Sequence, residues 1–564
     1  MMLNSSVGAR PNPVQGSRVP MPFCQRLGTS MYTSGRRSGD AVRRSQRVCV
    51  RAVETKHTPG NVIGPVPVDD TMLAVPNIRH RLIAQPSPFC VHNNFGGGFV
   101  SDGDGVALNS MKFASYHSAG CTIAAHDAAV ASAAVGGASL TPATPLAPGT
   151  SAASTNSLHE DAAIASAAIA EASLVGTSLI EASMDQLGGS LPLWALRAGA
   201  RDKIYFDPKQ VTAAIVTCGG LCPGLNDVVA GLVNKLATYG VPDGNILGIR
   251  YGFRGFYDTT MKPIILTPKT VDGIQLEGGT VLGTSRGGAN MKEIVKRIDM
   301  WGIDMLFVVG GNGGNAGANA IDALCQQHEV NCCVVGIPKS IDNDILLIDK
   351  CFGFDTAVEE SQRALLAAKV EASSAKHGIG LVKLMGRSSG FIALQASMAS
   401  GVVDAVLIPE VPFKLKGLMK HLEGVLKNKG HCVLCVAEGA GQDMLGDGTD
   451  GKDASGNPIL KDIGTFLKKE LKEHFQDADI KYIDPTYMIR AIPTTSGDRI
   501  YCKILAHNAV HAAFSGYTGL TVGLVNTHYC YLPIPVVISA PRKVDPRGKA
   551  WNRLRATIGQ PNLD

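Results

Sequence analysis

Two carboxylates, a hydroxyl and an amine lie close together in the segment PKSIDND, which begins at Pro338. All four follow a short apolar run directly, at the end of an expected strand; they are Lys339, Ser340, Asp342 and Asp344. Carboxylates two positions apart suit phosphoryl transfer, because one can accept the proton of an attacking hydroxyl while the other supports a metal ion. The alternative is an Asx-rich turn in which these side chains only cap the backbone.

Three glycine-rich segments precede this group, at residues 219–224, 278–288 and 310–317, and two of them directly follow expected strands. Glycines let backbone amides approach an anion closely, and the amino terminus of a following helix favours negative charge. The second segment adds hydroxyls and Arg286, which suit phosphate oxygens. One such turn could serve only to reverse the chain, but three together favour a nucleotide or a polyphosphate. None matches the P-loop pattern, and their spacing departs from GxGxxG.

A third polar set follows strands later in the chain. It comprises Arg387 in MGR, Glu410 after an apolar run, and Arg490 in YMIR. Each residue alone is typical of a surface. Together at strand ends they could bind a sugar phosphate, with the glutamate on hydroxyls and the arginines on phosphate.

The elements that position these residues are short apolar runs alternating with helical patterns. One helix is expected between Asn226 as its N-cap and Gly240 as its stop, and another over about 355–374. The expected strands are 213–218, 246–249, 305–309, 332–337, 379–384, 405–408 and 432–436. This alternation is typical of βαβ units. We therefore predict an α/β fold with two Rossmann-like lobes, mainly parallel sheets, and ligands at the strand ends between the lobes.

The charge of the chain is divided unevenly. The 564 residues have a formal net charge of +5, but residues 1–51 hold nine arginines, no lysine and one acid, a net +8, so residues 52–564 carry −3. An Arg- and Ser-rich leader almost free of acid is typical of an organelle transit peptide, and its end resembles a chloroplast processing region. A mitochondrial or cytoplasmic location and a retained basic tail are the alternatives. We expect no nucleic-acid partner, because the basic excess lies at the extreme amino terminus.

Residues 52–195 have a different composition from the rest. The stretch 122–190 is strongly enriched in Ala, Ser, Gly and Thr and lacks the large side chains that build a core. We interpret 52–195 as a variable, partly disordered, low-complexity extension, with a packed helical pair as the alternative. The chain has no run of 18 consecutive apolar residues, so no membrane span is expected.

The motifs GGxxPGxN, GGTxLGTSR, PKSIDNDI, MGR, PEVPF and YMIR occur in an order that resembles the 6-phosphofructokinase family, most closely its plant-type, ATP-dependent branch. The resemblance covers residues 196–564 and implies a catalytic domain there. It divides that domain into a nucleotide lobe of about 211–355 with a carboxyl-terminal return, and a sugar-phosphate lobe of about 356–495.

The resemblance also implies roles for individual residues. Asp342 matches the general base that takes the proton from the C1 hydroxyl of fructose 6-phosphate. The implied substrate-binding residues are Ser340, Ile341, Asp342, Asp344, Met385, Gly386, Arg387, Glu410, Tyr487, Met488, Ile489 and Arg490. The implied ATP-binding residues are Gly220, Arg286, Gly287, Gly311, Asn312, Gly313 and Gly314. The resemblance implies an Asp at the position of Gly313 in the pyrophosphate-using members of the family. A glycine there favours ATP as the donor.

One departure concerns the metal. Family members have GGDG in the third glycine segment, and that Asp is the Mg²⁺ ligand, whereas this chain has Asn312. An amide keeps one oxygen but loses a full charge, and Mg²⁺ prefers carboxylates. The neighbours Gly314, Asn315 and Ala316 depart from the family pattern as well.

Three functions are therefore compared. The first is a plastid 6-phosphofructokinase that depends on ATP and Mg²⁺ and forms a homo- or hetero-tetramer. It retains activity, at a level that Asn312 can lower. The second is a catalytically weak subunit that binds fructose phosphate and regulates an active partner. The third is a pyrophosphate-dependent enzyme, against which Gly313 argues.

Overall fold

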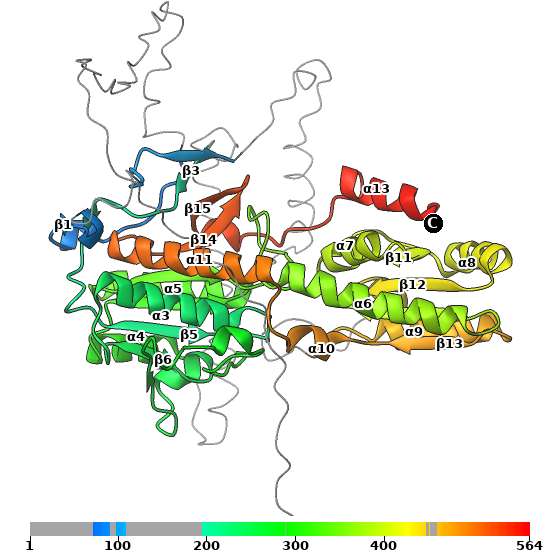
Figure 1. Ribbon diagram of the computed structural model, residues 1–564, viewed down its shortest axis with the longest axis horizontal. Helices are drawn as coiled ribbons and strands as arrows, with labels where there is room; N and C mark the ends of the chain where they lie inside the picture. Colours follow the sequence, from blue (N-terminus) through cyan, green and yellow to red (C-terminus); the bar gives the residue numbers. More distant parts are fainter. Residues whose placement is uncertain are drawn as a thin grey trace, which may run out of the picture. The chain divides into compact units, whose positions relative to one another are not determined.

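The computed structural model describes residues 72–90, 98–108, 194–287, 289–446, 451 and 459–563 (Figure 1). The leader and the Ala-rich stretch 122–190 lie outside these ranges. No helix in the described part of the chain is long and apolar enough to cross a membrane. The rest forms two α/β lobes, each built on its own sheet.

The larger sheet belongs to the first lobe and has the strand order β2-β3-β15-β14-β9-β8-β5-β6-β7. Its strands are β2 (Gly105–Ala107), β3 (Trp194–Arg197), β5 (Ala213–Thr217), β6 (Ile246–Ile249), β7 (Ile264–Ile265), β8 (Met305–Gly310), β9 (Cys333–Pro338), β14 (Leu520–Val525) and β15 (His528–Pro533). The five central strands from β14 to β6 are parallel, and the pairings at both edges are antiparallel.

Two layers of helices cover this sheet, which explains why its central strands are continuous apolar runs. The helices are α3 (Leu225–Tyr239) and α11 (Ser496–Phe514) on one face, and α4 (Met291–Met300) and α5 (Asn312–Gln327) on the other. Successive side chains of a strand point to opposite faces, so Phe307 packs under α3 and α11 while Leu306 and Val308 pack under α4 and α5. Figure 1 shows α3 and α11 lying side by side along the sheet.

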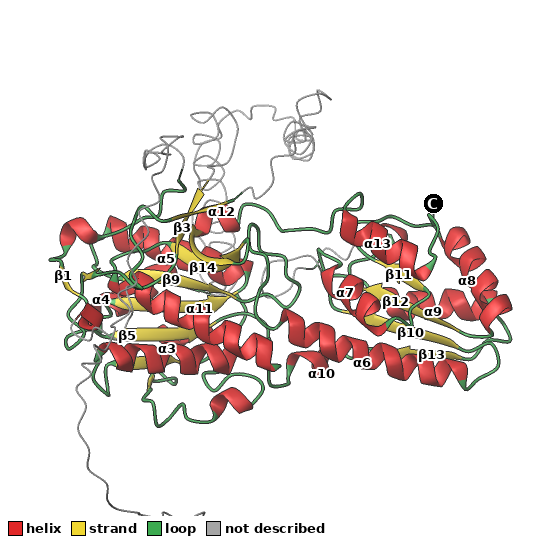
Figure 2. Cartoon of the chain, turned by 45° about the horizontal axis from the view of Figure 1, so that its top comes forward, coloured by secondary structure: helices red, strands yellow, loops and turns green. Residues whose placement is uncertain are grey.

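The second lobe has a wholly parallel sheet of order β11-β12-β10-β13. Its strands are β10 (Ile379–Leu384), β11 (Ala405–Leu407), β12 (Cys432–Ala437) and β13 (Ile480–Ile483). Helices α6 (Phe354–Ser373), α7 (Phe391–Ser400) and α13 (Lys549–Ile558) cover one face, and α8 (Leu415–Lys429) and α9 (Ile463–His474) cover the other (Figure 2).

The chain passes between the lobes three times. It enters the second lobe through α6 and returns through the short helix α10 (Thr486–Arg490) into α11. It then crosses once more after α12 (Ile534–Val537), because Trp551 and Leu554 of α13 are buried in the core of the second lobe. The expected return to the nucleotide lobe is therefore followed by a further crossing that the sequence pattern did not indicate.

Two segments of the expected extension pack on the first lobe. Residues 98–108 contain β2, whose partner is β3, and residues 72–90 contain β1 (Gln85–Pro86), which pairs with β4 (Lys203–Ile204). The carboxylate of Asp102 accepts hydrogen bonds from three side chains of this region, those of Arg79, Arg201 and Tyr517. These parts of 52–195 thus contribute to the folded domain.

Two local predictions were wrong. Asn226 is not an N-cap, because α3 already begins at Leu225 after Gly224. The Asn226 side chain instead bonds Val281 in the second glycine segment and Glu277 just before it. The third glycine segment is not a turn throughout: Gly311 is the N-cap of α5, and Asn312 to Gly317 form its first turns. The seven expected strands are all present, within one or two residues of their expected ends.

Candidate active site

The loop that follows β9 holds the acidic residues in a fixed shape. Asn343 adopts the left-handed conformation, with φ of 58°, and its side chain bonds the backbone of the same loop at Cys351 (2.8 Å) and Asp349 (3.3 Å). The Ser340 hydroxyl donates to Asp344. These contacts fix the backbone of the loop at Asn343 and hold the Asp344 carboxylate at Ser340.

Asp342 has the most perturbed carboxylate of this loop. Burial raises its pKa to about 8, and the negative charges of Asp344 and Glu438 add to the effect, while the backbone amide of Arg387 and the charge of Lys339 oppose it. Its Oδ1 is buried and has no hydrogen-bond partner among the described residues. A carboxylate kept basic, with one oxygen left for a further hydrogen bond, is suited to accept a proton from a bound hydroxyl.

The first and second glycine segments are joined by hydrogen bonds. The Gly219 amide donates to Ser285 (3.0 Å), and the Thr284 hydroxyl donates to the Gly219 carbonyl (2.7 Å). A Cβ at Gly220 would lie 3.0 Å from Nη2 of Arg286 and 3.8 Å from Nη1 of Arg490. Two arginines from distant parts of the sequence therefore converge on this glycine, an arrangement suited to phosphate oxygens.

The third glycine segment places the amino terminus of α5 beside the acidic loop. The Gly311 Cα is so close to that loop that a Cβ there would lie 3.0 Å from the Lys339 carbonyl. The buried Asn315 side chain bonds the carbonyls of Gly310 (3.2 Å) and Gly311 (3.1 Å) and keeps them turned inward. The first amides of a sixteen-residue helix remain to bind an anion. A Cβ at Gly313 would meet no protein atom within 4 Å.

Asn312 contacts the acidic loop directly. Its Nδ2 donates to Oδ2 of Asp344 over 3.4 Å, and its Oδ1 is buried with no hydrogen-bond partner in the described part of the chain. The neutral amide therefore contacts the Asp344 carboxylate as a hydrogen-bond donor and brings no charge of its own. No group of three His, Cys, Asp or Glu side chains among the described residues could hold a metal by itself.

This donor set still fits a Mg²⁺ ion that is shared with a polyphosphate. Mg²⁺ commonly keeps several waters and takes one or two protein ligands together with phosphate oxygens. The Asp344 carboxylate and the unpaired Asn312 oxygen are the residues that would hold it. The set lacks the second negative charge that would attract a free ion.

Several of the residues predicted to bind the sugar phosphate lie at strand ends of the second lobe. Met385 and Gly386 follow β10, and Gly386 approaches the backbone of Ser389 closely, with φ of 133°. Arg387 lies near Glu438, the residue that follows β12. Burial raises the pKa of Glu438, and the charges of Arg387, Lys383 and Arg490 oppose the shift.

The Glu410 carboxylate is held by backbone amides. It accepts hydrogen bonds from Gly390 at 3.0 and 3.1 Å and from Val544 at 2.8 Å. Burial raises its pKa, and these two amides oppose the rise. Gly390 precedes α7 and Val544 precedes α13, so the position of Glu410 depends on two distant elements.

The remaining predicted residues divide into exposed and buried ones. Tyr487 and Met488 are 80% and 75% exposed. The next residue, Ile489, is 1% exposed and packs in the core of the second lobe. The guanidinium carbon of Arg490 lies 4.9 Å from the centre of the Tyr487 ring. Ile341 packs against the cores of both lobes. Gly287 is exposed, with φ of 65°.

Two residues near Asp342 were absent from the predicted site. Lys339 is buried and influences Asp342 electrostatically, and Glu438 raises the pKa of Asp342. Lys339 was visible in the motif. The signal for Glu438 was an acid directly after the apolar run 432–437, the same signal that indicated Glu410.

Comparison with known proteins identifies the family of this chain. The phosphofructokinase family model matches residues 212–513. ATP-dependent 6-phosphofructokinase 5, chloroplastic, of Arabidopsis thaliana is 56% identical over 377 residues, which cover 66% of this chain and 70% of that protein. ATP-dependent 6-phosphofructokinase of Borreliella burgdorferi is 43% identical over 380 residues, which cover 65% and 85% of the two chains.

Among solved structures, a pyrophosphate-dependent phosphofructokinase from Marinobacter aquaeolei has a TM-score of 0.52 at 18% identity, with 62% of this chain and 91% of that chain covered. That likeness concerns the fold alone. The family model and the relatives together establish that this chain belongs to the phosphofructokinase family. The fold class and the family that we predicted from the sequence are confirmed.

Proposed function

We propose that this chain transfers the γ-phosphoryl group of ATP to the C1 hydroxyl of fructose 6-phosphate, giving fructose 1,6-bisphosphate and ADP. The observation that carries the proposal is the Asp342 carboxylate, whose pKa is raised and whose Oδ1 is buried with no hydrogen-bond partner among the described residues. The relatives named ATP-dependent 6-phosphofructokinase support it.

The residues divide the work by their chemistry. Asp342 accepts the proton of the C1 hydroxyl, which leaves the oxygen free to attack the γ-phosphorus in line. The α5 amino terminus, Arg286 and Lys339 stabilise charge on the phosphoryl oxygens. Arg387 and Arg490 bind the 6-phosphate, and Glu410 binds sugar hydroxyls. When bound, Mg²⁺ would neutralise charge on the ATP phosphates, and Asp344 and Asn312 would hold it.

A second candidate function rests on one observation, the amide of Asn312 beside Asp344. With one charge fewer, the site binds Mg²⁺ less tightly, which suits a catalytically weak subunit that binds fructose phosphate and regulates an active partner. A pyrophosphate-dependent reaction is less well supported, because the open space at Gly313 leaves room for the rest of a nucleotide.

We also propose a homo- or hetero-tetramer and a plastid location. The leader composition supports the location, and so do two relatives whose names include "chloroplastic". The oligomer rests on the family resemblance alone.

A steady-state assay of the full chain tests these proposals. Fructose 1,6-bisphosphate formation is measured with ATP or pyrophosphate as the donor while Mg²⁺ is varied. Turnover with ATP is expected. The regulatory-subunit function is favoured if the wild type forms no product with either donor and Asn312→Asp gains turnover with ATP. Turnover with pyrophosphate alone would contradict the choice of donor.

A further inference from the structure

The segment Pro541–Val544, which we call the strap, connects α12 to α13 and runs past both halves of the candidate site. At its start, Pro541 forms an antiparallel bridge with Ile345, and the Arg542 amide donates to the Asp344 carbonyl over 2.8 Å. At its end, the Val544 amide donates to Oε1 of Glu410 over 2.8 Å. Four consecutive residues thus bond the acidic loop on one side and a predicted sugar ligand on the other.

The Arg542 side chain strengthens the first of these connections. Its Nη1 donates to the Asp349 carbonyl over 2.9 Å, and its guanidinium carbon lies 4.8 Å from the centre of the Phe391 ring. Asp349 belongs to the loop that Asn343 braces, and Phe391 is the first residue of α7. Arg542 therefore joins the acidic loop to the amino terminus of α7, where the Gly390 amide also holds Glu410.

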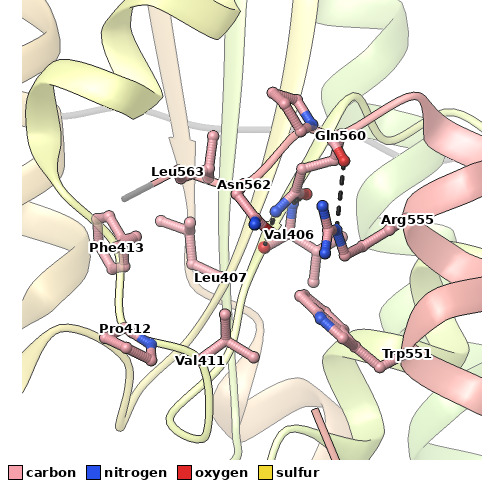
Figure 3. Close-up of a pocket in the computed structure, with 11 residues that line it drawn as sticks. Val406, Leu407, Val411, Pro412, Phe413, Trp551, Arg555, Gln560, Asn562 and Leu563 are labelled. Carbon is pink, nitrogen blue, oxygen red and sulfur yellow. Dashed lines mark hydrogen bonds between the residues drawn. The ribbon is translucent and has the colours of Figure 1, made fainter. Parts of the chain in front are cut away.

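The strap is anchored firmly beyond its end. In α13, Trp551 and Leu554 are buried in the second core. The Gln560 side chain hydrogen-bonds the edge strand β11 in the way that a neighbouring strand would. It accepts from the Val406 amide (2.7 Å) and donates to the Val406 carbonyl (3.1 Å). Figure 3 shows Gln560 beside Val406, with Trp551 below, around a cavity of about 30 Å³. The Lys414 amide donates to the Leu563 carbonyl over 2.7 Å.

We propose that the strap positions the acceptor side of the site, with Arg542 and the Val544 amide as positioning residues that act through the acidic loop and Glu410. The inference rests on the proposed function, since it assigns Glu410 and the acidic loop to fructose 6-phosphate. Neither residue touches the substrate. Each holds a group that does, at the correct distance from Asp342. The hydrogen bonds of the strap go to the acidic loop and to Glu410, and the strap reaches the donor side through Asp344, to which the Asn312 side chain donates.

The first test compares Arg542→Ala with Arg547→Ala, which removes an exposed arginine of the same connection. The KM for fructose 6-phosphate is expected to rise about tenfold in Arg542→Ala, because the hydrogen bond from the charged side chain to the Asp349 carbonyl is lost, while the KM for ATP changes less. Arg542→Lys restores part of the loss through its remaining charge and donors. A variant with less folded enzyme would show a lower kcat and no change in either KM. That result would overturn the proposal, and so would equal effects of the two alanine variants.

The second test separates the Val544 amide from its side chain. Val544→Pro removes the donor to Glu410, whereas Val544→Ala keeps it and shortens only the buried side chain. The KM for fructose 6-phosphate is expected to rise more in the proline variant than in the alanine variant. Equal KM values in the two variants would show that the amide does not position Glu410.

Amide hydrogen exchange distinguishes failure of the strap from failure of the proposed function. It needs no turnover and is measured on the full chain. Arg542→Ala is expected to speed exchange in residues 340–351 and at Gly390, whereas Arg547→Ala leaves both unchanged. If the wild type makes no product but this difference appears, the proposed function fails and the strap remains. If exchange does not differ, the strap proposal fails whatever the activity.

Discussion

The donor side and the acceptor side of the candidate site are built in different ways. The donor side consists of backbone at glycine segments and at the α5 amino terminus, with Arg286 nearby. The acceptor side consists of half-buried charged side chains, such as Glu410 and Glu438, that amides and arginines from other elements hold in place. The residues of the donor side therefore lie within short local motifs, whereas the acceptor side depends on contacts between distant segments.

The two sides also differ in how they depart from the family. On the acceptor side the resemblance finds one conservative departure, Ser340 where threonine is usual, while on the donor side Asn312 stands where the resemblance implies Asp. The Asp342 carboxylate lies between the two sides. Substitutions in each region show whether the chemistry is limited by the base, by the metal or by positioning.

The largest expected effect is that of Asp342→Asn, which removes the base from the acceptor side. Turnover is expected to fall by ~10²–10⁴. The folded protein should become more stable, because wild-type Asp342 has a pKa of about 8 against an ordinary 3.8 and so disfavours folding as it ionises. Between pH 4 and 8, Asp342 is protonated in the folded wild type and ionised in the unfolded chain. The folded wild type therefore loses stability as the pH rises through this range, whereas the Asn variant has no such loss.

Activity assays and thermal unfolding from pH 5 to 9 check both parts. The gain in Tm of Asp342→Asn over the wild type should grow with pH and be largest above about pH 8. A variant that keeps its turnover would remove Asp342 from the role of base. A gain in Tm that is independent of pH would show that the carboxylate is not buried in the way described.

On the donor side, Asn312→Asp is expected to raise turnover with ATP by about 10² at limiting Mg²⁺, since a full charge is restored near the phosphates. It should also place two carboxylates side by side where an amide now bonds Asp344. Without Mg²⁺ the variant should unfold at a lower temperature than the wild type, and added Mg²⁺ should stabilise it more. If free Mg²⁺ shifts the Tm of both proteins equally, residue 312 does not contribute to the metal site.

A smaller effect is expected from Gly220→Ala, which tests the close approach at the first glycine segment. The added methyl would lie 3.0 Å from Nη2 of Arg286, so the KM for ATP should rise roughly tenfold while the KM for fructose 6-phosphate changes less. Gly424→Ala is the matched control, because a methyl there meets nothing within 4 Å in helix α8 and should stabilise the protein by roughly 0.5–1 kcal/mol. Equal KM values for ATP in both variants would separate Gly220 from the nucleotide.

The smallest expected effect is that of Glu438→Gln on pH dependence. Asp342 acts as a base only when ionised, so kcat/KM should increase with pH up to about 8 in the wild type. Removing the negative charge of Glu438 lowers the pKa of Asp342, which should move the rising limb to lower pH by less than about one unit. Glu473→Gln, an exposed substitution in α9, serves as the control. An unchanged limb would mean that Glu438 and Asp342 do not interact.

The strands and the acidic loop could be predicted because their signals are local. Each expected strand is a run of apolar residues that must be buried on both faces, and the loop PKSIDND follows one of them directly. Asn226 was misread because its side chain, which could have capped α3, bonds the second glycine segment fifty residues away. The helical start at Asn312 was missed because glycines are poor helix formers, and only the packing of α5 on the sheet offsets that preference.

The roles of the site residues remain predictions, and the structure decides which of them can act together. Sequence alone determined the order of elements, the α/β class and the family, and it predicted Asp342 as the base, because apolar patterns and short motifs depend only on neighbouring residues. Tertiary structure alone decided that Arg286 and Arg490 meet at Gly220, that Glu438 influences Asp342, and that the strap holds Glu410. These contacts join residues that lie more than sixty positions apart in the sequence, and no local pattern records which distant segment will supply a hydrogen bond or exclude water from a carboxylate.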